Sequence, residues 1–187
     1  RGEALGEYLS DDLILVICRN GDFFTTNFDL SNHYEDNILI IEKFDSSKVW
    51  TAALWDADQK YNYLKRFQLE SSSRKQNFLG ENTESRLLLL TDETYPRIEV
   101  IFGGHDSFRE TLVLDAEEFI SVKGFKAKGK RISTYEVETV NELEPVRFAQ
   151  ESKNISETVE EDEENLDDKS NTDILDEITG QMKLFDE

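Results

Sequence analysis

Cysteine is almost absent from this sequence of 187 residues. Because Cys18 is the only cysteine, no disulfide can form within the chain. Cys18 ends the apolar run 13–18, so we expect a small buried thiol at this position. The lack of disulfides favours a reducing compartment, and we therefore expect a cytoplasmic protein.

Long apolar runs are also missing from the sequence. No stretch of eighteen apolar residues occurs, so we expect neither a membrane-spanning helix nor a membrane partner. The first residue is Arg1 rather than Met, and no basic-then-apolar leader follows it. We therefore expect a piece of a longer protein, whose function is that of a part.

Positive charge is scarce, because 21 basic residues stand against 41 acidic ones and the formal net charge is −20. Such a balance disfavours a protein that coats nucleic acid with its whole surface. The acidic excess is uneven: residues 141–187 hold 16 acids and 4 bases, whereas residues 1–140 hold 25 and 17. A local basic stripe within the first 140 residues is compatible with these numbers and is the feature to look for.

Residues that could carry catalysis are few. His33 and His105 stand beside turn residues without any metal-ligand spacing, and we interpret both as surface histidines. Asp56 and Asp58 have the spacing of a turn rather than of a catalytic pair. No phosphate-binding loop, serine nucleophile elbow or metal-ligand cluster occurs. We therefore predict no catalytic residue, metal site or cofactor, and an uncharacterised enzyme on a β scaffold is the least favoured hypothesis.

Residues 1–140 have the pattern of β-strands. The apolar run 13–18 is followed by Asn20-Gly21, a strong hairpin signal because both residue types tolerate positive φ. A short turn is expected at 115–118. The other expected strands are 23–28, 37–44, 49–55, 61–69, 86–90, 96–102, 111–114, 119–122 and 130–137. The sequence therefore predicts an all-β fold.

The strand pattern restarts after a serine-rich connector at 71–73. Lys65-Arg66-Phe67 corresponds to Lys130-Arg131-Ile132 in the following unit, at an offset of 65 residues. Repeated four-stranded units are typical of radially arranged blades, and one irregular β-sandwich is the alternative. The predicted units are a first blade at 1–72 and a second blade at 73–148.

The composition changes after the second predicted blade. Acidic residues dominate 149–170, and too few large apolar residues are present to offset the entropy of ordering, which predicts a disordered acidic linker. In the last part, 171–187, residues Ile174, Ile178 and Met182 would share one face of a helix. We therefore predict a short amphipathic segment that forms a marginal helix on a partner.

The most informative residues are basic. Five cations fall within 123–131, together with two glycines, which let a backbone approach a partner, and one aromatic residue. Lys65-Arg66 occupies the matching place in the preceding unit, and this recurrence favours a basic stripe over solvated lysine-rich turns. The candidate phosphate-contacting residues are Lys65, Arg66, Arg74, Lys75, Lys123, Lys126, Lys128, Lys130 and Arg131.

Two stretches of the sequence resemble a known family. Residues 121–136, SVKGFKAKGKRISTYE, look like the last blades of topoisomerase IV A subunits of the Bacteroidetes type. Residues 7–17, EYLSDDLILVI, and the following Asn20-Gly21 resemble the recurring blade opening of gyrase and topoisomerase IV A subunits. The resemblance covers about residues 1–148.

The resemblance implies a partial β-pinwheel of about two four-stranded blades, whose basic rim holds double-stranded DNA through phosphate contacts that do not read sequence. It implies a non-catalytic part of an ATP-dependent type IIA topoisomerase that binds ATP and magnesium elsewhere. The rest of the A subunit and the B subunit would be its partners in a heterotetramer, associated with the nucleoid. The gyrase-box heptapeptide is missing, so relaxation and decatenation, as by topoisomerase IV, are expected rather than active supercoiling.

The C-terminal end carries a separate signal. Gln181, Met182, Leu184 and Phe185 resemble the pentapeptide by which bacterial proteins dock on the replication sliding clamp. In such a peptide the glutamine forms hydrogen bonds and the Leu-Phe pair fills an apolar pocket. The alternative is an apolar helix end that packs back on the blades. The preceding acidic residues would either compete with DNA for the cations or serve only to solubilise the chain.

Two functions therefore compete: a DNA-binding module, and a protein-interaction module of propeller-like fold without DNA binding. The positions of the cations distinguish them. One exposed face that carries both the cluster 123–131 and Lys65-Arg66 supports DNA binding, whereas scattered cations, or cations paired with the many acidic residues, support protein interaction.

Overall fold

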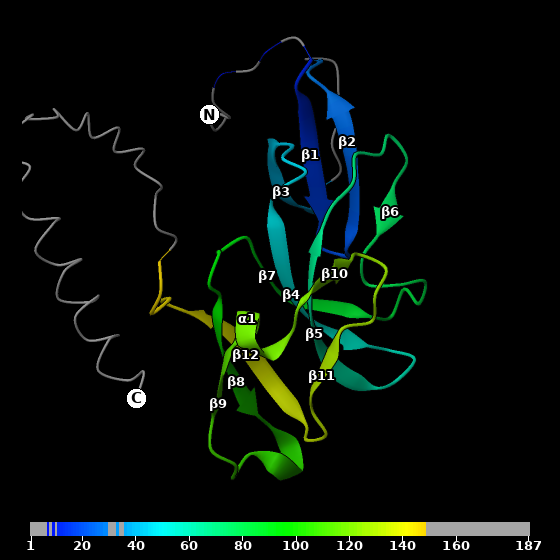
Figure 1. Ribbon diagram of the computed structural model, residues 1–187. Coiled ribbons are helices and arrows are strands. Elements are labelled where there is room, and N and C mark those ends of the chain that lie inside the picture. The colour runs from blue at the N-terminus through cyan, green and yellow to red at the C-terminus, as the bar shows by residue number, and fades with distance from the viewer. Residues whose placement is uncertain (1–6, 8, 10, 30–32, 34–35, 149–187) are drawn as a thin grey trace, which may run out of the picture. The chain divides into compact units, whose positions relative to one another are not determined.

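In the computed structural model, which describes residues 7, 9, 11–29, 33 and 36–148, the chain is built almost entirely of strands (Figure 1). The strands are β1 (Leu13–Cys18), β2 (Asp22–Asn27), β3 (Ile38–Lys43), β4 (Val49–Asp56), β5 (Tyr61–Gln68), β6 (Gln76–Asn77), β7 (Arg86–Thr91), β8 (Arg97–Phe102), β9 (Leu112–Asp115), β10 (Val122–Gly124), β11 (Lys130–Ser133) and β12 (Val137–Leu143). A 3-10 turn, η1 (Gly104–Asp106), follows β8, and the short helix α1 (Ala116–Phe119) follows β9. The all-β, pinwheel-like fold class expected from the sequence is confirmed.

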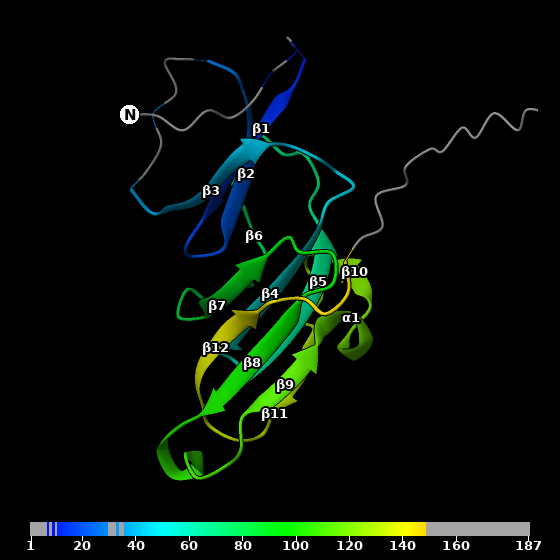
Figure 2. The ribbon, with the colours of Figure 1, turned by 90° about the vertical axis from the view of Figure 1, so that its left-hand side faces the viewer.

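The strands form three sheets. The first has the order β3-β1-β2-β6, the second β10-β5-β4-β7, with β11 also paired to β5, and the third β12-β8-β9. Neighbouring strands are antiparallel except for β10 and β5, which are parallel. Figure 2 shows the second sheet between the first and the third.

The second sheet takes this middle place because its two central strands are buried on both faces. Trp50 and Leu54 of β4 belong to the core shared with the first sheet, whereas Ala53 belongs to the core shared with the third. In β5, Tyr63 faces the first sheet and Leu64 faces the third. Successive side chains of a strand point to opposite faces, so a strand whose successive side chains are all buried has a packing partner on each side.

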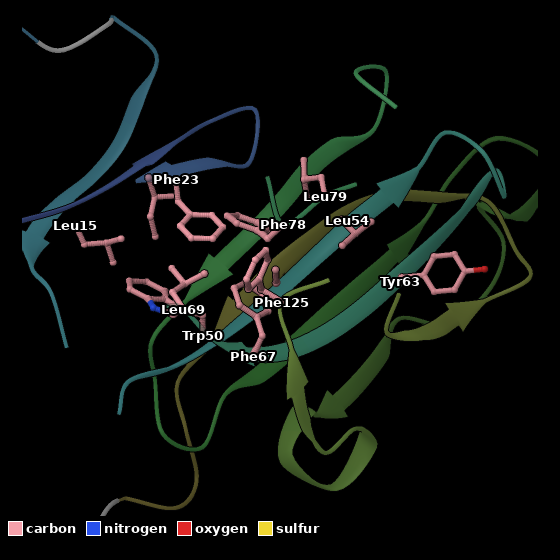
Figure 3. Close-up of a cluster of buried hydrophobic side chains, with 12 residues drawn as sticks. Leu15, Phe23, Trp50, Leu54, Tyr63, Phe67, Leu69, Phe78, Leu79 and Phe125 are labelled. Atoms are coloured by element: carbon pink, nitrogen blue, oxygen red, sulfur yellow. The ribbon is translucent and has the colours of Figure 1, made fainter. Parts of the chain in front are cut away.

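The core between the first and second sheets is aromatic, as Figure 3 shows. The Phe78 ring lies 5.1 Å from that of Phe67 and 6.3 Å from that of Phe23, centroid to centroid. Phe125 meets Phe23 edge-on at 5.0 Å. The core between the second and third sheets consists mainly of aliphatic side chains: Ala53, Leu64, Ile98, Val100, Phe102, Ala116, Ile120, Ile132 and Val140.

The first hairpin agrees with the sequence. β1 and β2 are joined at Asn20-Gly21, where Gly21 has a φ of +86° and leaves no room for a Cβ, which would lie 2.5 Å from Leu79 Cγ. Cys18 is buried in an apolar cluster with Ile14 and Val16 on the far face of the first sheet. The expected buried thiol is thus confirmed.

The sheets do not divide at residue 72. β7 pairs with β4, and β10 and β11 pair with β5, so the blades expected at 1–72 and 73–148 share the second sheet. The strand expected at 119–122 begins only at Val122, because Asp115 Oδ1 accepts hydrogen bonds from two backbone N–H groups and caps α1. The strand expected at 130–137 is divided into β11 and β12.

Candidate nucleic-acid interface

Residues 123–131, called the basic loop below, run along one edge of the second sheet (Figure 1). At its start, β10 pairs with β5 in the register Val122 to Arg66. At its end, β11 pairs with β5 in the register Lys130 to Leu64. Because both ends are hydrogen-bonded to the same strand, β5 fixes the loop at its two ends and the loop covers that edge of the sheet.

The five cations of the basic loop are exposed. Lys130 Nζ donates to the Phe119 carbonyl oxygen at 3.3 Å and lies 4.4 Å from the centroid of that ring. The Arg131 guanidinium carbon lies 3.9 Å from the centroid of the Tyr61 ring. Among the residues that the structure describes, no carboxylate forms an ion pair with Lys123, Lys126, Lys128, Lys130 or Arg131.

Phe125 holds the middle of the basic loop. Its side chain is buried in the aromatic core (Figure 3). The lysines nearest to it along the chain, Lys123, Lys126 and Lys128, are exposed. Lys126 Nζ lies 5.8 Å from the centroid of the Phe125 ring. The lysines around one aromatic residue in the sequence thus belong to a loop that Phe125 anchors. The aromatic ring is buried in the core, and the charged side chains face solvent.

Lys65 does not face solvent, contrary to its expected role as a phosphate contact. Its side chain is 4% exposed, and its Nζ donates to the carbonyl oxygens of Phe125 at 2.5 Å, Ala127 at 3.0 Å, and Phe78. Burial lowers the pKa of the Lys65 ammonium to about 8. A side chain enclosed in this way cannot reach a DNA phosphate, so Lys65 leaves the set of candidate DNA contacts.

Arg66 is buried as well, on the opposite face of β5. Its Nε donates to Thr51 Oγ1 at 3.3 Å. Burial lowers the pKa of the guanidinium, and the nearby carboxylates of Glu117 and Asp115 partly offset this effect. The expected contact of Arg66 with phosphate is likewise inconsistent with its burial, because β5 is covered on both faces.

The remaining predicted cations lie outside the second sheet. Arg74 and Lys75 are exposed in the connector that leads into β6 of the first sheet. Residues 65–67 and 130–132 were expected at equivalent places in two successive blades. They lie instead on neighbouring strands of one sheet, because β11 pairs with β5. Of the nine predicted residues, the structure therefore gathers five in the basic loop, separates two and buries two.

The aspartates and histidines that the sequence analysis excluded as catalytic residues either form a turn or lie exposed. Asp56 Oδ1 accepts the backbone N–H of Asp58 at 2.8 Å and that of Gln59 at 3.1 Å, which makes the expected turn. His33 and His105 are exposed. Within the described part of the chain, no three His, Cys, Asp or Glu side chains gather as metal ligands, and no helix has the length and apolar character for crossing a membrane.

The stability of the protein is expected to depend on pH through Lys65. Its pKa of about 8 in the folded state lies below the ordinary 10.5, so between these values the unfolded state binds more protons and stability rises with pH. Compared with Lys65→Met, the wild type should gain about 1 kcal/mol of unfolding free energy between about pH 7 and pH 9. Urea unfolding of both proteins at the two pH values measures this, and a constant difference would contradict it.

The predictions for the C-terminal part fall outside the described residues. These are the acidic linker 149–170, the amphipathic segment 171–187 and the clamp-binding residues Gln181, Met182, Leu184 and Phe185. They stay predictions from the sequence.

A match to a known protein family covers the region that holds the three sheets and the basic loop. The model of one protein family, described as topoisomerase C-terminal domain, Bacteroidota, matches residues 1–144. No curated protein matches the chain. The match ends one residue after β12 and so includes every strand described above. The chain therefore belongs to the family of topoisomerase C-terminal domains of Bacteroidota.

Proposed function

We propose that this domain binds double-stranded DNA through the basic loop, as the C-terminal part of the A subunit of a type IIA topoisomerase. The observation that supports the proposal is that the five loop cations are exposed and form no ion pair with a described carboxylate. In a chain with a net charge of −20, a cluster of cations that pairs with no carboxylate of the described residues marks a surface that attracts a polyanion.

The proposed binding mode is contact with phosphates rather than with bases. A loop that lies flat along a sheet edge offers no helix or ribbon long enough to enter the major groove. Lysine side chains on such a loop neutralise phosphates whatever the sequence, which suits a protein that holds any DNA segment. The parent enzyme would consist of this domain, the rest of the A subunit and the B subunit. It would use the DNA bound by this domain in relaxation and decatenation, as topoisomerase IV does.

Neutralising two loop lysines tests the proposal. We expect the double variant Lys126→Gln/Lys128→Gln to bind a labelled duplex more weakly and to lose about 2 from the slope of log affinity against log salt. The matched control, Lys43→Gln/Arg97→Gln, removes two cations outside the loop and should leave the slope unchanged. Fluorescence anisotropy at several salt concentrations measures both. Equal slopes for the two double variants would refute a basic-loop interface.

One observation favours the alternative, a protein-interaction module. Phe108 is 77% exposed beyond η1, and the Arg109 guanidinium carbon lies 5.0 Å from its ring centroid and 3.3 Å from that of Tyr135. Arg109 Nε donates to Asp106 Oδ1 at 2.8 Å, so the exposed ring stands on an ordered base. Exposed aromatic side chains beside arginine are enriched in protein interfaces. If the wild type binds no duplex even at low salt, this surface becomes the better candidate.

A further inference from the structure

We propose that Lys65 is a positioning residue for DNA binding, which ties the basic loop to the segment 78–83 and so fixes where the loop lysines stand. The inference rests on the proposed function, because the loop is taken to be the DNA-binding surface. Lys65 would thus act on DNA binding without touching DNA itself.

The tie is made by one ammonium group and two segments far apart in the sequence. Lys65 Nζ donates to Phe125 O and Ala127 O of the basic loop and to Phe78 O of the other segment. A lysine ammonium has three N–H donors, and three carbonyls accept here. Among the described residues no carboxylate pairs with Lys65. The three carbonyls are therefore its hydrogen-bond partners in the described structure.

Both tied segments are also anchored by an aromatic side chain in the same core. Phe78 and Phe125 each pack against Phe23, and Phe78 also packs against Phe67 (Figure 3). Lys65 Nζ itself lies 5.3 Å from the centroid of the Phe67 ring. The side chains hold the two segments from within the core, and the ammonium holds their backbones together, so the position of one segment determines that of the other.

The tie lies in a cleft whose two walls carry opposite charges. Lys126 and Lys128 line the wall formed by the basic loop. Apart from Lys65 itself, the charged residues of the remaining lining are Asp22, Asp56, Asp58 and Glu81. In the described structure neither lysine forms an ion pair with these carboxylates. A loop released from Lys65 could close over the cleft and pair its lysines with the acids, which would remove them from the DNA-binding surface.

The wild-type protein allows a first test by lysine modification. The full chain is treated with a water-soluble acetylating reagent, with and without duplex DNA, and each lysine is quantified by mass spectrometry. We expect Lys65 to stay unmodified in both cases, and Lys126 and Lys128 to react unless DNA is present. Modification of Lys65 as fast as that of Lys126 would overturn the proposal.

The second test compares two variants that each lose one positive charge. Lys65→Met removes the tie, and Lys126→Met removes a loop cation. In Lys65→Met we expect trypsin to cleave the basic loop about tenfold faster than in the wild type, because local opening becomes easier. Lys126→Met should keep the wild-type rate at the remaining sites. If Lys65→Met does not fold, Lys65→Gln, which keeps two N–H donors, takes its place.

The DNA measurement separates positioning from a general structural role. Lys126→Met should lose about 1 from the salt slope, and Lys65→Met about 2 or more, because several lysines are displaced at once. Both are measured by anisotropy at a temperature where thermal unfolding curves show the variants folded. A folded Lys65→Met with the wild-type cleavage rate, or with no greater loss of slope than Lys126→Met, would overturn the inference. If the wild type binds no DNA, the proposed function fails, whereas the cleavage rates still decide whether the tie exists.

Discussion

Replacement of Trp50 by alanine is expected to lower the free energy of unfolding by about 3–5 kcal/mol. Trp50 is 1% exposed and belongs to the core between the first and second sheets. Its removal leaves a cavity bounded by side chains of both sheets, and strands paired on both edges cannot move in to fill it. Unfolding in urea, followed by far-ultraviolet circular dichroism, gives the change in unfolding free energy.

Trp55 provides a matched control for this experiment, because the chain has only two tryptophans and both lie in β4. Trp55 is only partly buried, and the Arg86 guanidinium carbon lies 5.0 Å from its ring centroid. Trp55→Ala should therefore cost about 1–2 kcal/mol, since less apolar surface returns to water. The tryptophan that remains in each variant reports unfolding by fluorescence. Equal costs for the two variants would contradict the assignment of Trp50 to the main core.

The local parts of the fold could be predicted from the sequence. Asn20-Gly21 and the flanking apolar run specify a hairpin by residues in direct succession, and the structure confirms it. The pairing of β10 and β11 with β5 could not be predicted, because it joins segments some 60 residues apart. Backbone hydrogen bonds between strands carry no sequence information, so the choice of partner depends on packing that no single segment records.

The burial of Lys65 shows where interpretation of the sequence fails. The sequence predicts an exposed stripe that includes Lys65-Arg66, because charged pairs are usually solvated. The opposing signal lies in the alternation of β5: Lys65 stands two residues from both Tyr63 and Phe67, and residues at this spacing share one face of a strand. Both neighbours are buried in the aromatic core, and Lys65 lies with them. The basic loop could be predicted because its five cations cluster around two glycines, Gly124 and Gly129.

Gly129→Ala is expected to disturb the basic loop far more than Gly124→Ala. Gly129 has a φ of +88°, and a Cβ there would lie 2.5 Å from the Leu64 carbonyl oxygen and 2.9 Å from Lys65 Cβ. The left-handed conformation and the clash with strand backbone together should cost about 2–4 kcal/mol of unfolding free energy. Gly124 has neither feature, because a Cβ at that position would meet no atom within 4 Å, so Gly124→Ala should change the free energy by less than about 1 kcal/mol. Thermal and urea unfolding of the two variants measure the difference. Because Gly129 contacts the strand that carries Lys65, the same substitution should also weaken duplex binding. A Gly129→Ala protein with wild-type stability and DNA affinity would mean that the loop does not depend on its close approach to β5.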